Sequence, residues 1–412
     1  MHNNIETVVH GGLCLGCGVC KDICRQHCIE IKHEKGIVFP VVVQENCTEC
    51  GLCLKACGGK GIDFNKKSHE LFSHNAKYDR MIGYYHSCLV SYSTDYSIRF
   101  HSASGGSVSQ FLIFLLEKHK IDGAVVVGFT KDDPFTPMSF VAESKSEIIS
   151  AKSSKYCVVS YEGIISDLLL RSGKYVVVGL PCHIHSFRKA MDVNRLLKEK
   201  IIGLFSLFCS SNRTSLSIDY LLYKYKVNKS EVSSFTFRDN GYLGNMVFRD
   251  KLDKTIKSVP YQEYWKGMRG FFNVPRCSMC IDHFGELADL SFGDLYAGKY
   301  KNEKIGVNSI ISRSSFWHDM IMEAQNEGCL YLEPVNVDLL KESQPYALKQ
   351  KKGKGVAAAM KIRKFLKKEI PDYGIVRYEK IGLMDILKEI TKKTMRVIGS
   401  HRCSWFILKT IG

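Results

Sequence analysis

The sequence predicts an α/β protein, α+β in its overall organisation, in which a cysteine-rich N-terminal segment precedes a body with a mainly parallel sheet. After about Leu71, apolar runs typical of buried strands alternate with runs typical of helices, the pattern of a sheet covered on both faces. Before that point, nine of the 17 cysteines lie between Cys14 and Cys57. We expect four regions: 1–72, 80–170, 171–345 and 346–412.

The elements of the body are predicted from local patterns. GGSVSQFLIFLLEKHK, residues 105–120, reads as a helix with one apolar side, and IDGAVVVGF, residues 121–129, reads as a buried strand. The runs 174–180 and 200–208 are two further predicted strands, and the helical stretch 183–199 separates them.

Two N-terminal segments share the spacing C-x2-C-x2-C-x3-C at an offset of 33 residues: CLGCGVCKDIC from Cys14 and CTECGLCLKAC from Cys47. With this spacing three cysteines wrap one [4Fe–4S] cluster, and the fourth reaches the other cluster. A zinc ribbon is the alternative, but zinc sites combine two C-x-x-C pairs and not two quartets. The sequence therefore predicts two clusters, with the ligand sets Cys14, Cys17, Cys20, Cys57 and Cys47, Cys50, Cys53, Cys24.

The segment between the repeats, IEIKHEKGIVFPVVV, alternates and turns at Lys35-Gly36, as a β-hairpin does. Together with the repeats it resembles a bacterial two-cluster ferredoxin domain over about 60 residues. Arg25 and Gly58 stand where a proline usually follows each fourth cysteine, a departure that removes no ligand. Cys28 is spare, and is either a core thiol or an alternative ligand.

A third four-sulfur site is predicted from cysteines that are far apart in the sequence. The stretch PRCSMC contains one C-x-x-C pair, Cys277 and Cys280, which lacks two partners. Cys182 and Cys209 each follow a predicted strand, and in an open parallel sheet the carboxyl ends of the strands share one rim. Taken singly, Cys182 or Cys209 is better explained as a buried thiol, but the orphan C-x-x-C pair, which needs two partners, shifts the balance towards a shared site.

The turn HSASGGS precedes the first helix of the body. The backbone N–H groups of Ser104, Gly105, Gly106 and Ser107 at such a helix start suit a phosphate, although the same pattern is also an ordinary helix cap. Lys155, with Tyr156 beside it, could meet a phosphate, or could be a solvated lysine next to a strand.

The chain resembles the beta-subunit family of coenzyme F420 hydrogenases and dehydrogenases, from roughly Cys14 to Asp294. The resemblance rests on six stretches in order: SASGG at 102–106, SKY at 154–156, GLPCH at 179–183, GLFSLFC at 203–209, FRDNGY at 237–242 and RCSMCIDHFGELADLSFGD at 276–294. It implies a fold that binds FAD and a [4Fe–4S] cluster on Cys182, Cys209, Cys277 and Cys280.

The resemblance also suggests roles for single residues around the flavin. The FAD pyrophosphate would lie on the SASGG turn, and Lys155 near the flavin or a phosphate. His183 replaces the glutamine that usually follows the Pro-Cys pair, as a candidate proton donor at the flavin edge or as a structural histidine.

Motifs and resemblance together predict an iron–sulfur flavoprotein oxidoreductase. Electrons would pass from a donor protein or reduced ferredoxin through the [4Fe–4S] clusters to FAD, and then to an unidentified acceptor or to F420. The alternative is an electron-transfer subunit that serves a partner enzyme and has no substrate of its own. The formal charge of +16 is compatible with nucleic-acid binding, but the sequence contains no recognition-helix or RNA-binding motif that supports such a function.

The tail from residue 351 to residue 412 has 16 Lys and Arg against 5 Asp and Glu. The stretches 356–370 and 383–399 both have the apolar spacing of amphipathic helices. This pair either lies on an anionic membrane surface or an acidic partner, or packs its apolar side on the body. No secretory leader and no run of 18 apolar residues is recognisable, so we expect a cytoplasmic protein that could be peripheral at the membrane.

Overall fold

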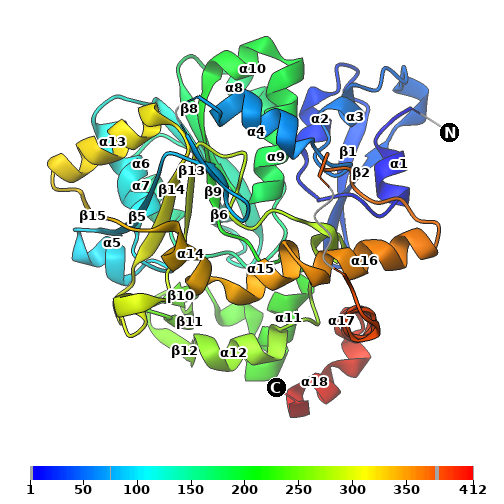
Figure 1. The fold of residues 1–412 in the computed structure, drawn as a ribbon. Helices are drawn as coiled ribbons and strands as arrows, with labels where there is room; N and C mark the ends of the chain where they lie inside the picture. Colours follow the sequence, from blue (N-terminus) through cyan, green and yellow to red (C-terminus); the bar gives the residue numbers. More distant parts are fainter. Residues whose placement is uncertain (1–2, 75, 376–379, 412) are drawn as a thin grey trace.

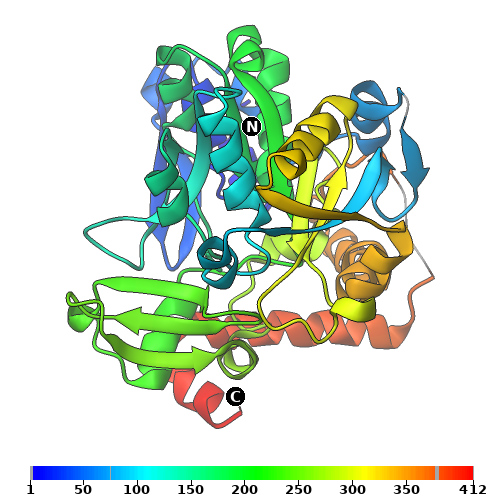
Figure 2. The ribbon, with the colours of Figure 1, turned by 90° about the vertical axis from the view of Figure 1, so that its left-hand side faces the viewer.

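An eight-stranded sheet forms the centre of the molecule, with the cysteine-rich segment beside it and a three-stranded sheet at the lower end in Figures 1 and 2. The computed structural model describes residues 3–74, 76–375 and 380–411. This mixed architecture confirms the predicted α/β class.

The N-terminal segment is built around the predicted hairpin. Its turn residues Lys35 and Gly36 have φ angles of 50° and 76°, as a tight two-residue hairpin turn requires. Each cysteine repeat contains a left-handed glycine that starts a short helix, Gly18 with φ 75° and Gly51 with φ 68°. The elements of this segment are α1 (Glu6–His10), α2 (Val19–Ile23), β1 (Ile29–Glu34), β2 (Ile37–Val42), η1 (Gln44–Asn46), α3 (Leu52–Lys55) and α4 (Phe64–Phe72).

The large sheet has the strand order β15-β5-β14-β13-β9-β8-β6-β7. Its four central strands, from β13 to β6, pair in parallel, and the remaining strands add in antiparallel pairs at both edges. The sheet is therefore mixed around a parallel centre, and the three predicted strands are β6, β8 and β9. The bounds are β5 (Ser87–Ser93), β6 (Gly123–Phe129), β7 (Pro137–Ala142), β8 (Tyr175–Gly179), β9 (Ile201–Leu207), β13 (Leu290–Asp294), β14 (Asn308–Ser312) and β15 (Leu330–Pro334).

Helices cover both faces of this sheet because successive strand residues point to opposite sides. In β8, Val177 belongs to the core shared with the N-terminal segment, whereas Val176 and Val178 belong to the opposite core. The first core includes α8 (Ile164–Leu170), α9 (Pro181–Val193) and α10 (Arg195–Lys200). The second includes α6 (Ser107–Glu117), α7 (Lys145–Ser150) and α13 (Ser315–Asn326), and α5 (Tyr96–Phe100) lies nearby.

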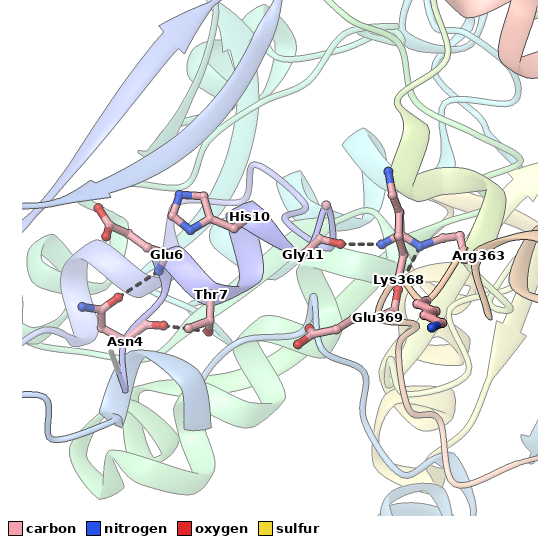
Figure 3. A pocket seen from close by; sticks show the side chains of 10 residues that line it. Asn4, Glu6, Thr7, His10, Gly11, Arg363, Lys368 and Glu369 are labelled. Atoms are coloured by element: carbon pink, nitrogen blue, oxygen red, sulfur yellow. Dashed lines mark hydrogen bonds between the residues drawn. The ribbon is translucent and has the colours of Figure 1, made fainter. Parts of the chain in front are cut away.

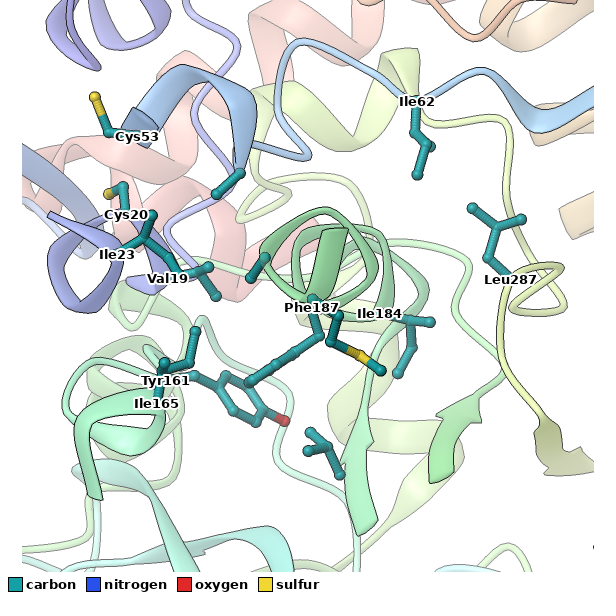
Figure 4. Packing of buried hydrophobic residues seen from close by; sticks show 14 of the residues in the cluster. Val19, Cys20, Ile23, Cys53, Ile62, Tyr161, Ile165, Ile184, Phe187 and Leu287 are labelled. Atoms are coloured by element: carbon teal, nitrogen blue, oxygen red, sulfur yellow. The ribbon is translucent and has the colours of Figure 1, made fainter. Parts of the chain in front are cut away.

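The first core joins the cysteine-rich segment to the body. In Figure 4, Val19 and Ile23 of α2 lie near Phe187 of α9 and near Tyr161. Phe187 and Ile184 are fully buried, and burial of side chains of this size stabilises the fold by about 1.5–3 kcal/mol each. The N-terminal segment is therefore held against α9, the helix that begins beside Cys182.

The three-stranded sheet forms a smaller unit below the large one (Figure 2). It consists of β10 (Ser234–Asp239), β11 (Asn245–Arg249) and β12 (Thr255–Pro260), which pack with α11 (Leu216–Tyr225) and α12 (Tyr261–Met268). The remaining elements before the tail are β3 (Lys77–Asp79), β4 (Gly83–Tyr85), η2 (Lys229–Glu231), η3 (Pro275–Met279), η4 (Gly298–Tyr300) and α14 (Val337–Ser343).

The basic tail is helical, and its two amphipathic stretches behave differently. α16 (Lys354–Phe365) buries its apolar residues from Val356 to Met360 on the body. α17 (Leu383–Ser400) instead leaves most of its large apolar residues exposed, so the interpretation that both helices pack their apolar sides on the body is wrong for α17. The other tail elements are α15 (Pro345–Lys351), η5 (Arg402–Ser404) and α18 (Trp405–Ile411). Among the described residues, no helix is both long and apolar enough to cross a membrane.

Candidate functional site

The first thiol group combines the first cysteine repeat with the last cysteine of the second repeat. Burial raises the pKa of Cys14 to about 12. The Gly16 N–H opposes this shift, and the thiols of Cys17 and Cys57 add to it. The pKa of Cys20 is also raised, by burial and then by Cys17, Cys57 and Cys14. Cys57 therefore lies with Cys14, Cys17 and Cys20, as the crossed ligand set requires.

The second thiol group lies around a cavity in the N-terminal segment. Cys24, Cys28, Cys47, Cys50 and Cys53 all line this cavity. Burial raises the pKa of Cys53 to about 11. Hydrogen bonds from two backbone N–H groups oppose this shift, and the thiols of Cys24 and Cys50 add to it. Cys28, which the spacing left spare, lies 3.4 Å from Cys24 between the two Sγ atoms. It is thus next to this group and not elsewhere in the core.

The third thiol group brings together four cysteines from three separate parts of the chain. Cys182 starts α9, Cys209 follows β9, and Cys277 and Cys280 lie at η3. Burial raises the pKa of Cys182 well above its ordinary value, and the thiols of Cys209, Cys280 and Cys277 add to that effect. The structure therefore places the orphan C-x-x-C pair over the rim where the two strand-end cysteines emerge.

In each of the three groups burial raises the pKa of at least one thiol, namely Cys14, Cys53 and Cys182. A bound iron–sulfur core requires thiolates, so its positive charge would have to offset this burial when it binds. Within residues 3–74, 76–375 and 380–411, no three side chains of His, Cys, Asp or Glu converge closely enough to hold a single metal ion.

A buried lysine that the sequence analysis missed contacts the third group. The Lys351 Nζ atom lies 3.3 Å from Cys280 Sγ and donates to the Asp282 carbonyl oxygen at 2.8 Å. Lys351 is only 2% exposed, so its ammonium acts on the thiols with little screening by water. The Asn212 backbone N–H also donates to Cys277 Sγ at 3.3 Å. No local motif marks Lys351, because its contacts are about 70 residues away in the sequence.

Two side chains connect the first group to the third. Cys17 Sγ lies 3.4 Å from the Ser186 hydroxyl, which donates to the Cys182 carbonyl oxygen at 3.2 Å. The two groups are thus separated by one turn of α9. Arg276, which is 3% exposed, donates from Nη2 to the Gly59 carbonyl oxygen at 2.9 Å. The Gly59 N–H in turn points to Cys57 Sγ at 3.2 Å.

An aromatic–arginine cluster lies beside the third group, between the carboxyl ends of the central strands and the small sheet. It is defined by Tyr156, Arg213, Arg238, Tyr242, Tyr261, Trp265, Asp294 and Tyr296. The Arg213 guanidinium lies 4.0 Å from the Trp265 ring centre, and Arg238 donates to Asp294 at 2.6 Å. Among the described residues, Arg213 Nε and Arg238 Nη2 are buried without a hydrogen-bond partner. Tyr296 remains 37% exposed, so the edge of the cluster reaches solvent.

The predicted phosphate turn lies at the same rim. Asn308 Oδ1 accepts from the Ser107 N–H at 3.2 Å, and Asn308 Nδ2 approaches the carbonyl oxygen of Gly293, next to Asp294, at 3.4 Å. The hydroxyls of Ser104 and Ser107 donate to Val307 O and Ser91 Oγ. These hydroxyls hold the turn in place, and residues 104–107 are all buried, with the Ser107 N–H already bonded to Asn308.

Lys155 is neither solvated nor directed at an open site. Its Nζ atom donates to the carbonyl oxygens of Ala151, Lys152 and Ser153, at 2.5, 2.7 and 3.2 Å. Burial lowers its pKa to about 7. Tyr156, by contrast, is part of the aromatic–arginine cluster, with its ring centre 4.8 Å from that of Trp265.

His183 is buried at the start of α9. Its Nδ1 atom accepts from the Leu180 N–H at 3.2 Å, and its ring packs 4.6 Å from Tyr161. Burial lowers its pKa to about 3, so the ring is neutral near pH 7. This arrangement favours a structural histidine over a proton donor.

A separate cavity of about 460 Å³ lies between α1 and the end of α16 (Figure 3). Glu6, His10, Arg363 and Lys368 are among its lining residues, and Arg363 hydrogen-bonds the Gly11 carbonyl oxygen. Asn4 lines both this cavity and that of the second thiol group. This cavity lies between the N-terminal segment and the tail, most of its lining residues are polar or charged, and none of them belongs to the third group.

Comparisons with known proteins agree with this geometry. Two family models match, the N-terminal part of the coenzyme F420 hydrogenase/dehydrogenase beta subunit at residues 88–166 and its C-terminal part at residues 172–338. The second range contains all four cysteines of the third group, whereas the two cysteine repeats lie outside both ranges.

Individual relatives are distant. The chain is 26% identical over 304 residues to the coenzyme F420-dependent sulfite reductase of Methanocaldococcus jannaschii, covering 70% of this chain but only 43% of that protein. It is 24% identical to the coenzyme F420 hydrogenase subunit beta of Methanosarcina barkeri, covering 64% of this chain and 89% of the relative. It is also 24% identical to the chloroplastic 7-hydroxymethyl chlorophyll a reductase of Oryza sativa subsp. japonica, covering 64% of this chain and 57% of that enzyme.

One solved structure shares the fold. A chain of the F420-reducing [NiFe] hydrogenase complex from Methanosarcina barkeri aligns with a TM-score of 0.55 and 22% identity, over 71% of this chain and 98% of that chain. Together, the two family models cover more than half of the 412 residues, in the order that the sequence motifs indicated. The chain belongs to the coenzyme F420 hydrogenase/dehydrogenase beta subunit family.

Proposed function

We propose that this protein is an iron–sulfur flavoprotein oxidoreductase that takes electrons from a ferredoxin-like donor and delivers them to an unidentified acceptor or to F420. In this proposal each of the three thiol groups holds a [4Fe–4S] cluster, and FAD binds at the aromatic–arginine cluster. The relatives named above are F420 hydrogenase subunits and reductases, which supports a redox function in general.

The observation that carries the proposal is the short contact path from the first thiol group to the third. Cys17 Sγ, the Ser186 hydroxyl and the backbone carbonyl oxygen of Cys182 follow one another within hydrogen-bond range. Two clusters held by these thiols would be separated by little more than one helical turn. Such close spacing is needed for single electrons to move between them and serves no purpose in two independent zinc sites.

The aromatic–arginine cluster fits a flavin in three respects. It offers aromatic faces for an isoalloxazine ring, and it has two buried guanidinium N–H groups, on Arg213 and Arg238, that lack a partner. It also adjoins the third group, since the thiols of Cys209 and Cys277 act on the pKa of Arg213, which burial lowers. FAD, when bound, accepts single electrons and passes them on in pairs.

The chain's own residues would support this chemistry in distinct ways. Lys351 and the Asn212 N–H place positive charge and a hydrogen bond on the sulfurs of the third group, and such contacts raise a cluster's reduction potential. Arg276 covers the first group from the side of η3. Lys351 and Arg276 are both buried, at 2% and 3% exposed, which limits access of water to the thiol groups beside them.

The alternative is an electron-transfer subunit whose substrate chemistry occurs on a partner enzyme. This alternative is supported by the likeness to one chain of a hydrogenase complex. The deciding experiment uses the purified, cofactor-loaded protein alone, reduced with an artificial low-potential donor. Steady turnover with F420 or NAD(P) would support the proposal that the protein is itself an oxidoreductase. Reduction that stops after the bound centres are filled, with no acceptor reduced, supports the subunit.

Replacing Asn308 by aspartate tests the predicted phosphate turn. The carboxylate keeps an acceptor for the Ser107 N–H but adds a negative charge at the start of α6, so it should repel a pyrophosphate. We expect FAD retention to fall at least about tenfold, equivalent to about 1.4 kcal/mol. The measurement is FAD released per chain on denaturation.

Asn245→Asp is the matched control, because Asn245 is a half-buried asparagine whose Nδ2 donates to the Ser258 hydroxyl at 3.1 Å in a solvent-exposed hydrogen bond. Wild-type FAD content in Asn308→Asp, at unchanged iron content, would place the pyrophosphate elsewhere. Gly105 is a poor position for this test, since a Cβ there would lie 2.8 Å from the Ser91 carbonyl oxygen and disturb the sheet.

Replacing Lys351 by methionine tests its influence on the third group. Loss of a buried positive charge disfavours the added electron, so the midpoint potential of that cluster should fall. We expect a shift on the order of 60 mV, which is a tenfold change for a one-electron couple. An EPR-monitored redox titration measures it. Lys351→Arg should retain most of the wild-type potential, and equal potentials in all three proteins would contradict the assigned role.

A further inference from the structure

α17 presents its apolar side to solvent. Its exposed large residues are Leu383 (73%), Met384 (63%), Leu387 (44%), Ile390 (48%) and Val397 (53%). Leu383, Leu387, Ile390 and Val397 follow steps of four, three and seven residues, which align them along one side of a helix. We define these five residues as the apolar stripe. From Leu383 to Val397 it is about 21 Å long, at 1.5 Å per residue.

The opposite side of α17 is polar and faces the body. Glu389 is 4% exposed and bonds with Gln350 at 3.3 Å and with Lys392. Gly399 is also buried, and a Cβ there would lie only 2.1 Å from the Phe271 carbonyl oxygen. Ile398 packs on the core of the small sheet and Met395 lies against Gly270, but the five residues of the stripe remain exposed, unlike the apolar side of an ordinary surface helix.

The end of the tail fixes this orientation. Trp405 and Leu408 of α18 are buried in the core of the small sheet, at 4% and 1% exposed. Trp405 Nε1 donates to the Gly399 carbonyl oxygen at 3.0 Å, and Arg402 pairs with Asp219 at 2.6 Å. Figure 2 shows α17 lying lengthwise along the base of the molecule. The helix is thus held with its stripe outward and cannot simply roll to bury it.

The charges around the stripe have one sign. Between residues 380 and 409 the exposed charged side chains are Lys380, Lys388, Lys393, Arg402 and Lys409, all basic. Of the two acidic residues of α17, Glu389 is buried, and Asp385 is half-buried at the first turn of the helix, where it accepts from the Gly382 N–H at 3.0 Å. A second copy of the chain would bring two such basic rims together, which opposes self-association through this side.

We propose that the apolar stripe of α17 docks on an anionic lipid surface. The helix would lie in the plane of the interface, with the stripe inserted at the headgroup–acyl boundary and the lysines beside it at the phosphates. This inference is independent of the proposed redox function, since no residue of the three thiol groups or of the aromatic–arginine cluster takes part.

The test uses the full-length, cofactor-loaded protein and co-sedimentation with vesicles at low salt. The wild-type protein should bind phosphatidylglycerol-containing vesicles at least about tenfold more tightly than vesicles of phosphatidylcholine alone, and added salt should weaken the binding. Leu387→Asn/Ile390→Asn should reduce this binding about tenfold or more. Leu170→Asn is the matched control, because Leu170 is an 88% exposed leucine on α8, and it should bind like wild type.

A charge variant separates the two parts of the proposal. Lys388→Gln/Lys393→Gln should weaken binding to phosphatidylglycerol vesicles and reduce its dependence on salt. Iron content and thermal unfolding should match wild type in every variant, since the changed side chains are exposed.

Three results would overturn the proposal. The first is no binding of the wild-type protein to phosphatidylglycerol vesicles at low salt. The second is equal, salt-sensitive binding by the stripe variant and wild type, which would mean a general attraction to basic residues. The third is concentration-dependent dimerisation, without vesicle binding, that Leu387→Asn/Ile390→Asn abolishes, which would assign the stripe to a second copy.

Discussion

Cys182→Ser should remove about one third of the protein-bound iron and leave the other two clusters in place, because it breaks one ligand set of three. Cys277→Ser should have the same effect, although the two residues are almost 100 positions apart in the chain. The shared result follows from their placement in one group, where the thiols of Cys209, Cys280 and Cys277 all act on Cys182. Iron and sulfide content, together with the EPR spectrum of the reduced protein, measures the loss.

The same variants should block electron delivery to the flavin while the N-terminal clusters are still reduced. Cys157→Ser is the matched control, because Cys157 is a buried thiol, 1% exposed, that belongs to none of the three groups. It should keep the full iron content. Wild-type iron in both Cys182→Ser and Cys277→Ser would show that the third group is only a cluster of free thiols.

The N-terminal segment was predictable in detail because its information is local. The turn at Lys35-Gly36 and the glycines Gly18 and Gly51 all adopt the positive φ angles that their positions require. The crossing of Cys57 to the first group also follows from spacing alone, since three cysteines two apart leave the fourth out of reach of its own cluster.

The third group was predictable only in part. Cys182 and Cys209 could be selected because each follows a predicted strand. The unpaired C-x-x-C of Cys277 and Cys280 indicated that two further ligands were needed. Nothing in the sequence near Lys351, Ser186 or Arg276 shows that each lies against a thiol group. Their contacts depend on how α9, η3 and α15 pack in three dimensions, and a lysine-rich stretch such as KKGK is typical of a solvated turn.

The sheet and the tail show the same limit. Parallel pairing was predicted from alternation, but β5, β14 and β15 add in antiparallel pairs between segments more than 200 residues apart. Periodicity identified α17 as amphipathic without showing which side meets the body. Contacts with Gln350 and Phe271, far from α17 in sequence, decide that the polar side does.

The crossed ligand sets of the N-terminal segment lead to a second large expected effect. Cys57→Ser should lose the same cluster as Cys14→Ser, with about one third of the iron, and Cys24→Ser and Cys50→Ser should both lose iron from the other cluster, up to the same third. The reason is that Cys57 acts on the pKa of Cys14 and Cys20, whereas Cys24 acts on that of Cys53. Matching EPR signals within each pair of variants, and different signals between pairs, would establish the crossing.

Cys28 makes the second pair of variants more informative. Its Sγ atom is 3.4 Å from that of Cys24, so it is positioned to replace the lost ligand in Cys24→Ser. Cys28→Ser alone should keep all the iron, and Cys24→Ser/Cys28→Ser should lose more than Cys24→Ser. If Cys57→Ser instead shares its remaining EPR signals with Cys50→Ser, each repeat holds its own cluster and the crossed assignment is wrong. The contact path from Cys17 through Ser186 would then begin at a cluster bound by Cys14, Cys17, Cys20 and Cys24, and its distance to the third group would have to be measured anew.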